Sequence, residues 1–123
     1  MARILIAEDN DDIRDLVVRA LSDEGHDLVA TADGGAALDV LKQRNAVFDL
    51  LLTDVKMPVM DGIALALAAG RDHPDMAIIL MTGYADQRER THRLGALVHD
   101  VVAKPFSLEQ IQGAVREALV ARP

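Results

Sequence analysis

The chain has 123 residues, of which 50% are hydrophobic and only 2% aromatic. A chain of this length is expected to fold as one domain, residues 1–123, around an aliphatic core, with no room for a second domain. Its 13 basic and 20 acidic residues give a net charge of −7, which argues against nucleic acid or an anionic membrane as partner. The chain has no cysteine, so disulfides, thiol nucleophiles and thiolate metal sites are excluded.

The N-terminal segment lacks the features of a targeting signal. Only Arg3 and a short apolar run, residues 4–7, precede Glu8, and this run is far shorter than the apolar region of a signal peptide. The longest apolar stretch covers residues 63–70, whereas a membrane-spanning helix needs roughly 20 residues. We therefore expect a soluble protein of the cytoplasm.

Apolar residues alternate between strand-like and helix-like spacing along the chain. In chain order we expect a strand at 4–7, a helix over 13–21, a strand at 28–31, a helix around 37–41, a strand at 48–53, a helix over 62–71, a strand at 77–81, a helix over 86–94, a strand at 101–103 and a helix over 108–119. Gly25 stops the first helix, Asp33 and Gly34 form the turn before the second, and Ser107 caps the last.

Five apolar strands that alternate with helices predict a particular fold class. Parallel strands need crossover connections, and strands buried on both faces are apolar along their whole length. The expected fold is therefore α/β, a doubly wound parallel sheet with helices on both faces. Ligands of such sheets bind outside the carboxyl ends of the strands. The polar residues at these ends are Glu8, Asp9, Asp54, Thr82 and Lys104.

The acidic residues at the strand ends predict a magnesium site with a reactive aspartate. Mg²⁺ prefers oxygen ligands and usually takes one or two carboxylates, here Asp9 and Asp54, beside water and phosphate oxygens. Without a cation, mutual repulsion with Glu8 would raise at least one pKa, so the acidic cluster itself argues for a bound metal. A carboxylate that attacks a phosphoryl group forms an acyl phosphate, and Asp54 is the candidate nucleophile.

Other residues at the same edge would support a phosphoryl group. Lys104 would bring a positive charge to a phosphoryl oxygen, and Thr82 would supply a hydroxyl donor. Gly83 would let a backbone N–H approach closely. Pro105 allows a cis peptide bond that would place Lys104.

Together, these residues resemble a known family. Glu8-Asp9, Asp54-Val-Lys-Met57-Pro58-Val-Met-Asp61-Gly62, Thr82-Gly83 and Lys104-Pro105-Phe106 are similar to the motifs of the receiver domain of two-component response regulators. The resemblance extends over essentially the whole chain. It implies a flavodoxin-like fold with five helices and the strand order 2-1-3-4-5. It also implies a stand-alone receiver domain without an output domain.

The resemblance assigns a role to each residue of the site. It implies that Asp54 accepts a phosphoryl group from a histidine kinase or a histidine phosphotransfer protein. It implies Mg²⁺, or Mn²⁺ in its place, bound by Asp9, Asp54 and the backbone carbonyl of Lys56, with Glu8 acting through water. It implies that phosphorylation draws the Thr82 hydroxyl toward the phosphoryl group and shifts a surface that contacts other proteins.

Two features distinguish this chain within the resemblance. Val101 stands where many receivers carry Tyr or Phe, so an aromatic rotamer switch is not implied here. Lys56 and Tyr84 lie two residues beyond Asp54 and Thr82, where they would flank the path of a hydrolytic water. We hypothesise that these two large side chains prolong the lifetime of the aspartyl phosphate.

Several functions remain open at the level of sequence. A receiver without an output domain acts either on a target protein or as a relay intermediate that passes the phosphoryl group to a histidine phosphotransfer protein. It takes part in its own phosphorylation and dephosphorylation but is not an enzyme. A Mg²⁺-dependent phosphohydrolase is a weaker alternative, because Asp54 is followed by Val55-Lys56 rather than by the Asp-x-Asp pattern of aspartate-nucleophile phosphatases.

Simpler interpretations exist for single residues. Asp54 could form a turn, Thr82 could be an ordinary strand residue and Lys104 a surface lysine, but their joint occurrence at successive strand ends favours a site. The four histidines lack the spacing of metal ligands. The predicted helix from residue 62 is apolar nearly all round, which its small alanines explain better than a docking surface does.

Overall fold

The computed structural model describes residues 2–43, 46–83 and 95–121. Within these ranges the strands are β1 (Arg3–Ala7), β2 (Asp27–Thr31), β3 (Leu50–Asp54), β4 (Ala77–Thr82) and β5 (Asp100–Ala103). The α-helices there are α1 (Asp11–Asp23), α2 (Gly34–Leu41), α3 (Gly62–Asp72) and α5 (Leu108–Ala121), and a short 3₁₀ helix, η1 (Gly95–Leu97), precedes β5. Of the helices in these ranges, none is long and apolar enough to cross a membrane.

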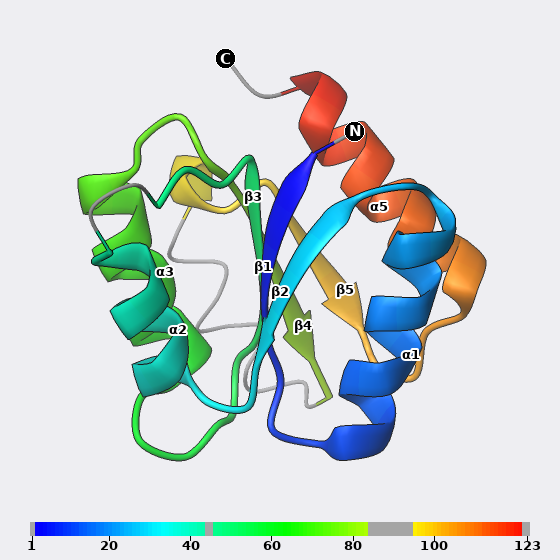
Figure 1. Ribbon diagram of the computed structural model, residues 1–123, viewed down its shortest axis with the longest axis horizontal. Helices are drawn as coiled ribbons and strands as arrows, with labels where there is room; N and C mark the ends of the chain where they lie inside the picture. The colour runs from blue at the N-terminus through cyan, green and yellow to red at the C-terminus, as the bar shows by residue number, and fades with distance from the viewer. Residues whose placement is uncertain (1, 44–45, 84–94, 122–123) are drawn as a thin grey trace.

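The five strands form one parallel sheet in the order β2-β1-β3-β4-β5. Helices α1 and α5 cover one face, and α2 and α3 cover the other (Figure 1). The predicted doubly wound α/β fold and its strand order are therefore confirmed. The described residues contain four of the five expected α-helices, and the helix expected over 86–94 lies outside these residues.

Side chains of the central strands alternate between two hydrophobic cores. In β1, Ile4 and Ile6 pack under α1 and α5, whereas Leu5 packs under α2 and α3. Strand β4 repeats the pattern, with Ile79 in the first core and Ile78 in the second. This alternation follows from the two-residue period of a strand, and it explains why the central strands are apolar at every position.

Polar side chains fix where the helices begin. The carboxylate or amide oxygens of Asn10, Asp33 and Asp61 accept hydrogen bonds from backbone N–H groups of α1, α2 and α3. Ser107 and Gln110 bond reciprocally to each other's backbone N–H, at 3.1 and 2.7 Å, in a capping box that starts α5. The predicted cap at Ser107 is thus confirmed.

Two predicted boundaries need correction. Asp33 and Gly34 were expected to form a turn, but Asp33 caps α2 and Gly34 is already its first residue. The strand expected from Phe48 begins at Leu50, where regular pairing with Ile4 starts. Phe48 packs in the core under α2 and α3 but forms no strand pair with β1, so its hydrophobic side chain does not mark the start of the strand. Burial and strand pairing are separate properties at this position.

Gly62, the first residue of α3, provides a test of how closely α3 approaches β3. A Cβ atom on Gly62 would lie 2.0 Å from the carbonyl oxygen of Asp54, which is backbone and cannot rotate away. We expect Gly62→Ala to lower the free energy of unfolding by roughly 1–3 kcal/mol. Gly113→Ala in α5 is the matched control, since a Cβ there would meet no atom of the described residues within 4 Å.

The two glycine variants should change stability in opposite directions. Alanine has a higher helix propensity than glycine, so Gly113→Ala should raise the free energy of unfolding by up to about 1 kcal/mol. Urea denaturation followed by circular dichroism measures both values. Similar shifts in the two variants would contradict the close approach at Gly62.

Candidate functional site

The residues predicted for the site lie at the carboxyl ends of neighbouring strands in the parallel sheet. Glu8 follows β1, Asp54 ends β3, Thr82 ends β4 and Lys104 follows β5. Because β1, β3, β4 and β5 are successive neighbours and run in the same direction, their carboxyl ends meet at one edge. The structure thus brings together residues that lie far apart in the sequence, as predicted.

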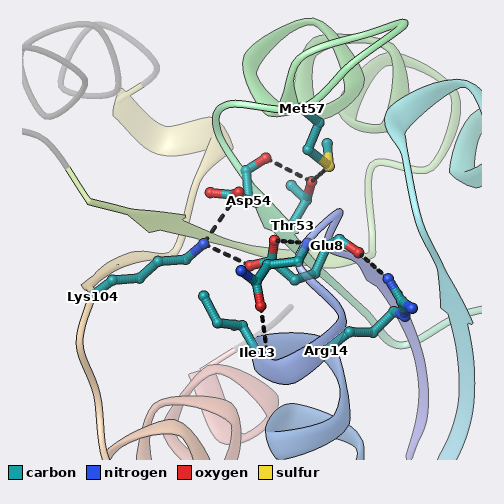
Figure 2. A network of polar contacts seen from close by, with 8 residues as sticks. Glu8, Ile13, Arg14, Thr53, Asp54, Met57 and Lys104 are labelled. Carbon is teal, nitrogen blue, oxygen red and sulfur yellow. Dashed lines mark hydrogen bonds and ion pairs between the residues drawn. The ribbon is translucent and has the colours of Figure 1, made fainter.

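The centre of the site is a lysine between two carboxylates (Figure 2). Lys104 Nζ lies 2.6 Å from Glu8 Oε1 and 3.1 Å from Asp54 Oδ2. The Glu8 side chain is fully buried, and those of Asp54 and Lys104 are only 9% and 17% exposed. One positive charge therefore compensates two carboxylates that are largely buried.

Glu8 is held by contacts that the sequence analysis missed. Its backbone carbonyl accepts a hydrogen bond from Arg14 Nη1 at 2.9 Å, as Figure 2 shows, and its side chain accepts one from the Asn10 N–H at 3.1 Å. Asp11 pairs with the other guanidinium nitrogen of Arg14 at 2.5 Å. In the sequence Arg14 is indistinguishable from an ordinary surface partner of Asp11 three residues before it. Only the folded chain shows that it also binds the end of β1.

Asp54 has a buried neighbour of its own. The hydroxyl of Thr53, which is completely buried, donates to the Asp54 backbone carbonyl at 3.0 Å and lies 3.9 Å from Met57 Sδ (Figure 2). Thr53 therefore supports the end of β3 from the side of α2 and α3. In the sequence, Thr53 is indistinguishable from an ordinary strand residue.

The acidic side chains form a set of oxygens that fits a divalent cation. Glu8, Asp9 and Asp54 each offer a carboxylate oxygen, and these oxygens all lie within 4.8 Å of one another. Asp9 is exposed, so the cluster is open to solvent on its side. Hard oxygen donors without nitrogen or sulfur suit Mg²⁺ as well as Ca²⁺ and Mn²⁺. The residues present therefore fit the expected metal.

A cavity of about 520 Å³ opens onto this cluster. Glu8, Asp9, Asp54, Lys56 and Lys104 line its polar part. Ile13, Leu16, Pro105 and Phe106 line an apolar part beside it. The cavity thus lies between the carboxylates and apolar side chains of α1 and of the segment after β5.

Of the remaining predicted residues, Gly83 and Pro105 line the same cavity, whereas Thr82 is buried beside it and is not among its lining residues. Thr82 is 1% exposed, and its carbonyl accepts a hydrogen bond from the Lys104 N–H at 2.8 Å. Gly83 lines the cavity, and among the residues that the structure describes none would lie within 4 Å of a Cβ on it. The peptide bond between Lys104 and Pro105 is cis, as the sequence allowed. Tyr84 lies outside the described residues.

Burial controls the ionisation of the central groups. It raises the pKa of the Glu8 carboxyl to about 7, although the hydrogen bonds from Lys104 and Asn10 oppose the shift. Burial likewise raises the pKa of Asp54 against the attraction of Lys104. For Lys104, burial alone lowers the pKa, but Glu8 and Asp54 outweigh it and the pKa is raised. Lys104 therefore stays charged while Glu8 titrates near neutrality.

This ionisation predicts how the stability of the metal-free protein depends on pH. The pKa of Glu8 rises from 4.5 to about 7 on folding, so between these pH values the folded chain binds more protons than the unfolded chain. The stability that this group contributes is complete below pH 4.5 and is lost as the pH rises through 7. Asp54 acts in the same direction, because its pKa is also raised.

We expect Glu8→Gln to remove most of this dependence. Relative to the variant, the wild type should lose roughly 1–3 kcal/mol of unfolding free energy between about pH 5 and pH 8. Urea denaturation with a chelator present measures the difference. Burial lowers the pKa of His26, which acts in the opposite direction but equally in both proteins. Parallel pH profiles of the two proteins would contradict the assignment to Glu8.

Comparisons with known proteins agree with this geometry. Residues 4–116 match the family model of the response regulator receiver domain. The chain is 36% identical over 121 residues to the response regulator receiver protein CpdR of Brucella abortus (strain 2308), covering 98% of this chain and 99% of that protein. It is 35% identical over 119 residues to sporulation initiation phosphotransferase F of Bacillus subtilis (strain 168), covering 95% and 93%.

A solved structure extends the similarity to three dimensions. The crystal structure of a CheY-like response regulator receiver domain protein from Methanospirillum hungatei JF-1 has a TM-score of 0.88 to this chain. The two are 31% identical, and the alignment covers 98% of this chain and 94% of that one. The chain therefore belongs to the response regulator receiver domain family, whose members are in general phosphoacceptors of two-component and phosphorelay signalling and not enzymes.

Proposed function

We propose that Asp54 accepts a phosphoryl group from a histidine kinase or a histidine phosphotransfer protein, and that this modification changes the contacts of the chain with other proteins. The observation that carries the proposal is the position of Lys104 Nζ, which contacts both Glu8 and Asp54. A lysine in this place compensates negative charge on Asp54 before and after the transfer.

The proposed transfer forms one bond and breaks another. A carboxylate oxygen of Asp54 attacks the phosphorus of a phosphohistidine, and a P–O bond forms as the P–N bond to the imidazole breaks. The imidazole leaves with the electron pair of that bond and takes up a proton. The attacking carboxylate must be ionised; burial raises the pKa of Asp54, and the attraction of Lys104 limits this rise. Lys104 therefore favours the reactive form.

The proposed metal is Mg²⁺, for which Mn²⁺ would substitute. Asp9, Asp54 and the backbone carbonyl of Lys56 would hold it, and Glu8 would act through water. A divalent cation at this place supplies positive charge for the transferring oxygens. The support for this assignment is the cluster of carboxylate oxygens within 4.8 Å and the presence of Lys56 in the wall of the same cavity.

The neighbouring residues are proposed to bind the phosphoryl group and to respond to it. Lys104 would pair with one phosphoryl oxygen, and Thr82 would donate its hydroxyl to another. Gly83 would bring its backbone N–H close, and Pro105 would fix the position of Lys104. The presence of Gly83, Lys104 and Pro105 in the wall of the same cavity supports these roles.

The proposed form of the protein is a stand-alone receiver, residues 1–123, in the cytoplasm, without nucleic acid or membrane as partner. The match to the CpdR relative over 99% of that protein supports a receiver that needs no attached output domain. The chain would take part in its own phosphorylation and dephosphorylation without turning over a substrate. The net charge of −7 supports the absence of a polyanionic partner.

Phosphorylation by a small acyl phosphate tests the proposal directly. With Mg²⁺ present, we expect the wild type to gain the mass of one phosphoryl group, which hydroxylamine should remove because an acyl phosphate is labile to it. Asp54→Asn should gain none, and a chelator should abolish the gain in the wild type. Intact-protein mass spectrometry measures the adduct. An equal adduct on Asp54→Asn would disprove the assignment.

Relay function is the second candidate, because the relative from Bacillus subtilis is named a phosphotransferase. The phosphorylated protein distinguishes the two roles. Transfer of labelled phosphate from Asp54 to a histidine phosphotransfer protein would support the relay. Capture of a target only by the phosphorylated form would support direct output.

Lys56 and Tyr84 are proposed to lengthen the lifetime of the aspartyl phosphate. Lys56 lines the cavity that contains Asp54, so its side chain can hinder an attacking water. We expect the double variant Lys56→Ala/Tyr84→Ala to lose the phosphoryl group several times faster than the wild type. The decay of labelled protein after removal of the donor measures the rate, and equal rates would exclude this role.

A further inference from the structure

The loop between β3 and α3, residues 55–61, is held closely at both ends. The Val55 N–H donates to the Met81 carbonyl in β4 at 3.0 Å, and the Gly62 N–H donates to the Val55 carbonyl at 2.8 Å. The loop therefore starts and finishes against the strand end that carries Asp54. Lys56, whose carbonyl is the proposed metal ligand, is the second residue of this loop.

The middle of the loop contains a strained turn. The Met60 N–H donates to the Pro58 carbonyl at 2.8 Å, so the hydrogen bond encloses Val59 alone. Val59 has φ of 72°, the left-handed region that a β-branched residue rarely adopts. Its side chain gains little from burial, because the residue is 85% exposed. Contacts elsewhere must hold this turn in place.

The start of α2 supplies these contacts, and two glycines make room for them. A Cβ on Gly34 would lie 2.1 Å from the Met60 carbonyl oxygen, and one on Gly35 would lie 2.7 Å from Val59 Cγ1. In Figure 1 the loop passes below the first turn of α2. A larger residue at Gly34 would meet the Met60 backbone, which cannot rotate away, and one at Gly35 would meet the Val59 side chain.

We infer that Gly34 and Gly35 are positioning residues for the cation site. They allow α2 to pack against the turn at Val59 and so fix the loop that presents the Lys56 carbonyl. Neither glycine would touch the metal. The inference rests on the proposed function, because it concerns the same cation, but it adds residues on a different helix.

The two glycines differ in what they contact, and Gly35 is the better test. Gly34 faces the Met60 backbone, which no single substitution removes. Gly35 faces the Val59 side chain, and Val59→Ala removes the Cγ1 atom. The Cβ atom that remains at position 59 would lie 3.7 Å from the new Cβ at position 35. The new Cβ would also lie 3.2 Å from Asp33 Oδ1, but this contact is the same with or without Val59→Ala.

The experiment is a double-mutant cycle on Mg²⁺ binding, measured by isothermal titration calorimetry. We expect Gly35→Ala to weaken binding roughly tenfold, in the range found for residues that orient metal ligands. The variant Gly35→Ala/Val59→Ala should bind Mg²⁺ as Val59→Ala alone does. Gly113→Ala, at a site with no atom of the described residues within 4 Å of the new atom, is the control and should bind as the wild type.

A second readout separates positioning from a general loss of structure. In the metal-free protein, Gly35→Ala should shift the amide resonances of residues 56–62, and Val59→Ala should cancel that shift. Alanine favours a helix over glycine, so Gly35→Ala should not lower the urea midpoint in proportion to the lost affinity.

The possible outcomes test the inference and the proposed function separately. Unchanged Mg²⁺ affinity in Gly35→Ala, or no recovery in the double variant, would overturn the inference while the proposed function stands. A wild type that binds no Mg²⁺ would overturn the proposed function and the inference with it.

Discussion

One ammonium group shared by two buried carboxylates determines how this site works. Lys104 Nζ contacts the largely buried carboxylates of Glu8 and Asp54, and burial disfavours the charged form of both acids. A single lysine offsets only part of this cost, and the pKa of Glu8 at about 7 is the result. The metal-free site therefore retains unbalanced negative charge at neutral pH. A cation beside Asp9, on the exposed side, would balance it.

The parallel sheet is what makes this arrangement attainable. Glu8 and Lys104 are separated by 96 residues in the chain, yet they pair because β1 and β5 end at the same edge. The apolar strands supply the stability that a group of buried charges takes away, since each central strand packs against helices on both faces. Hydrophobic burial in the two cores thus supports a site that would not be stable by itself.

The sequence predicted the features that follow from the spacing of apolar residues and from the polar residues at the strand ends. Alternating apolar spacing predicted five strands, and the parallel class then predicted that Asp54 and Lys104 meet. The sequence did not predict that Arg14 would bind the Glu8 carbonyl, or that Gly35 would face Val59. Both contacts join separate elements, and no local sequence pattern indicates how these elements pack. The strand order came from the resemblance of the motifs rather than from physical reasoning. The start of β3 was misplaced because Phe48 is buried without being paired.

Helices on the two faces of the sheet hold different parts of the site. Arg14 of α1 holds the strand end with Glu8 from one face, whereas the start of α2 holds the loop with Lys56 from the other. A cation bound by oxygens from both parts would therefore join the two helical layers at a single point. A strained turn at Val59 suits such a connection, because a loop with few alternative conformations transmits a displacement instead of absorbing it. By this inference helix α2, which precedes β3 in the chain, would move together with the loop that carries Lys56.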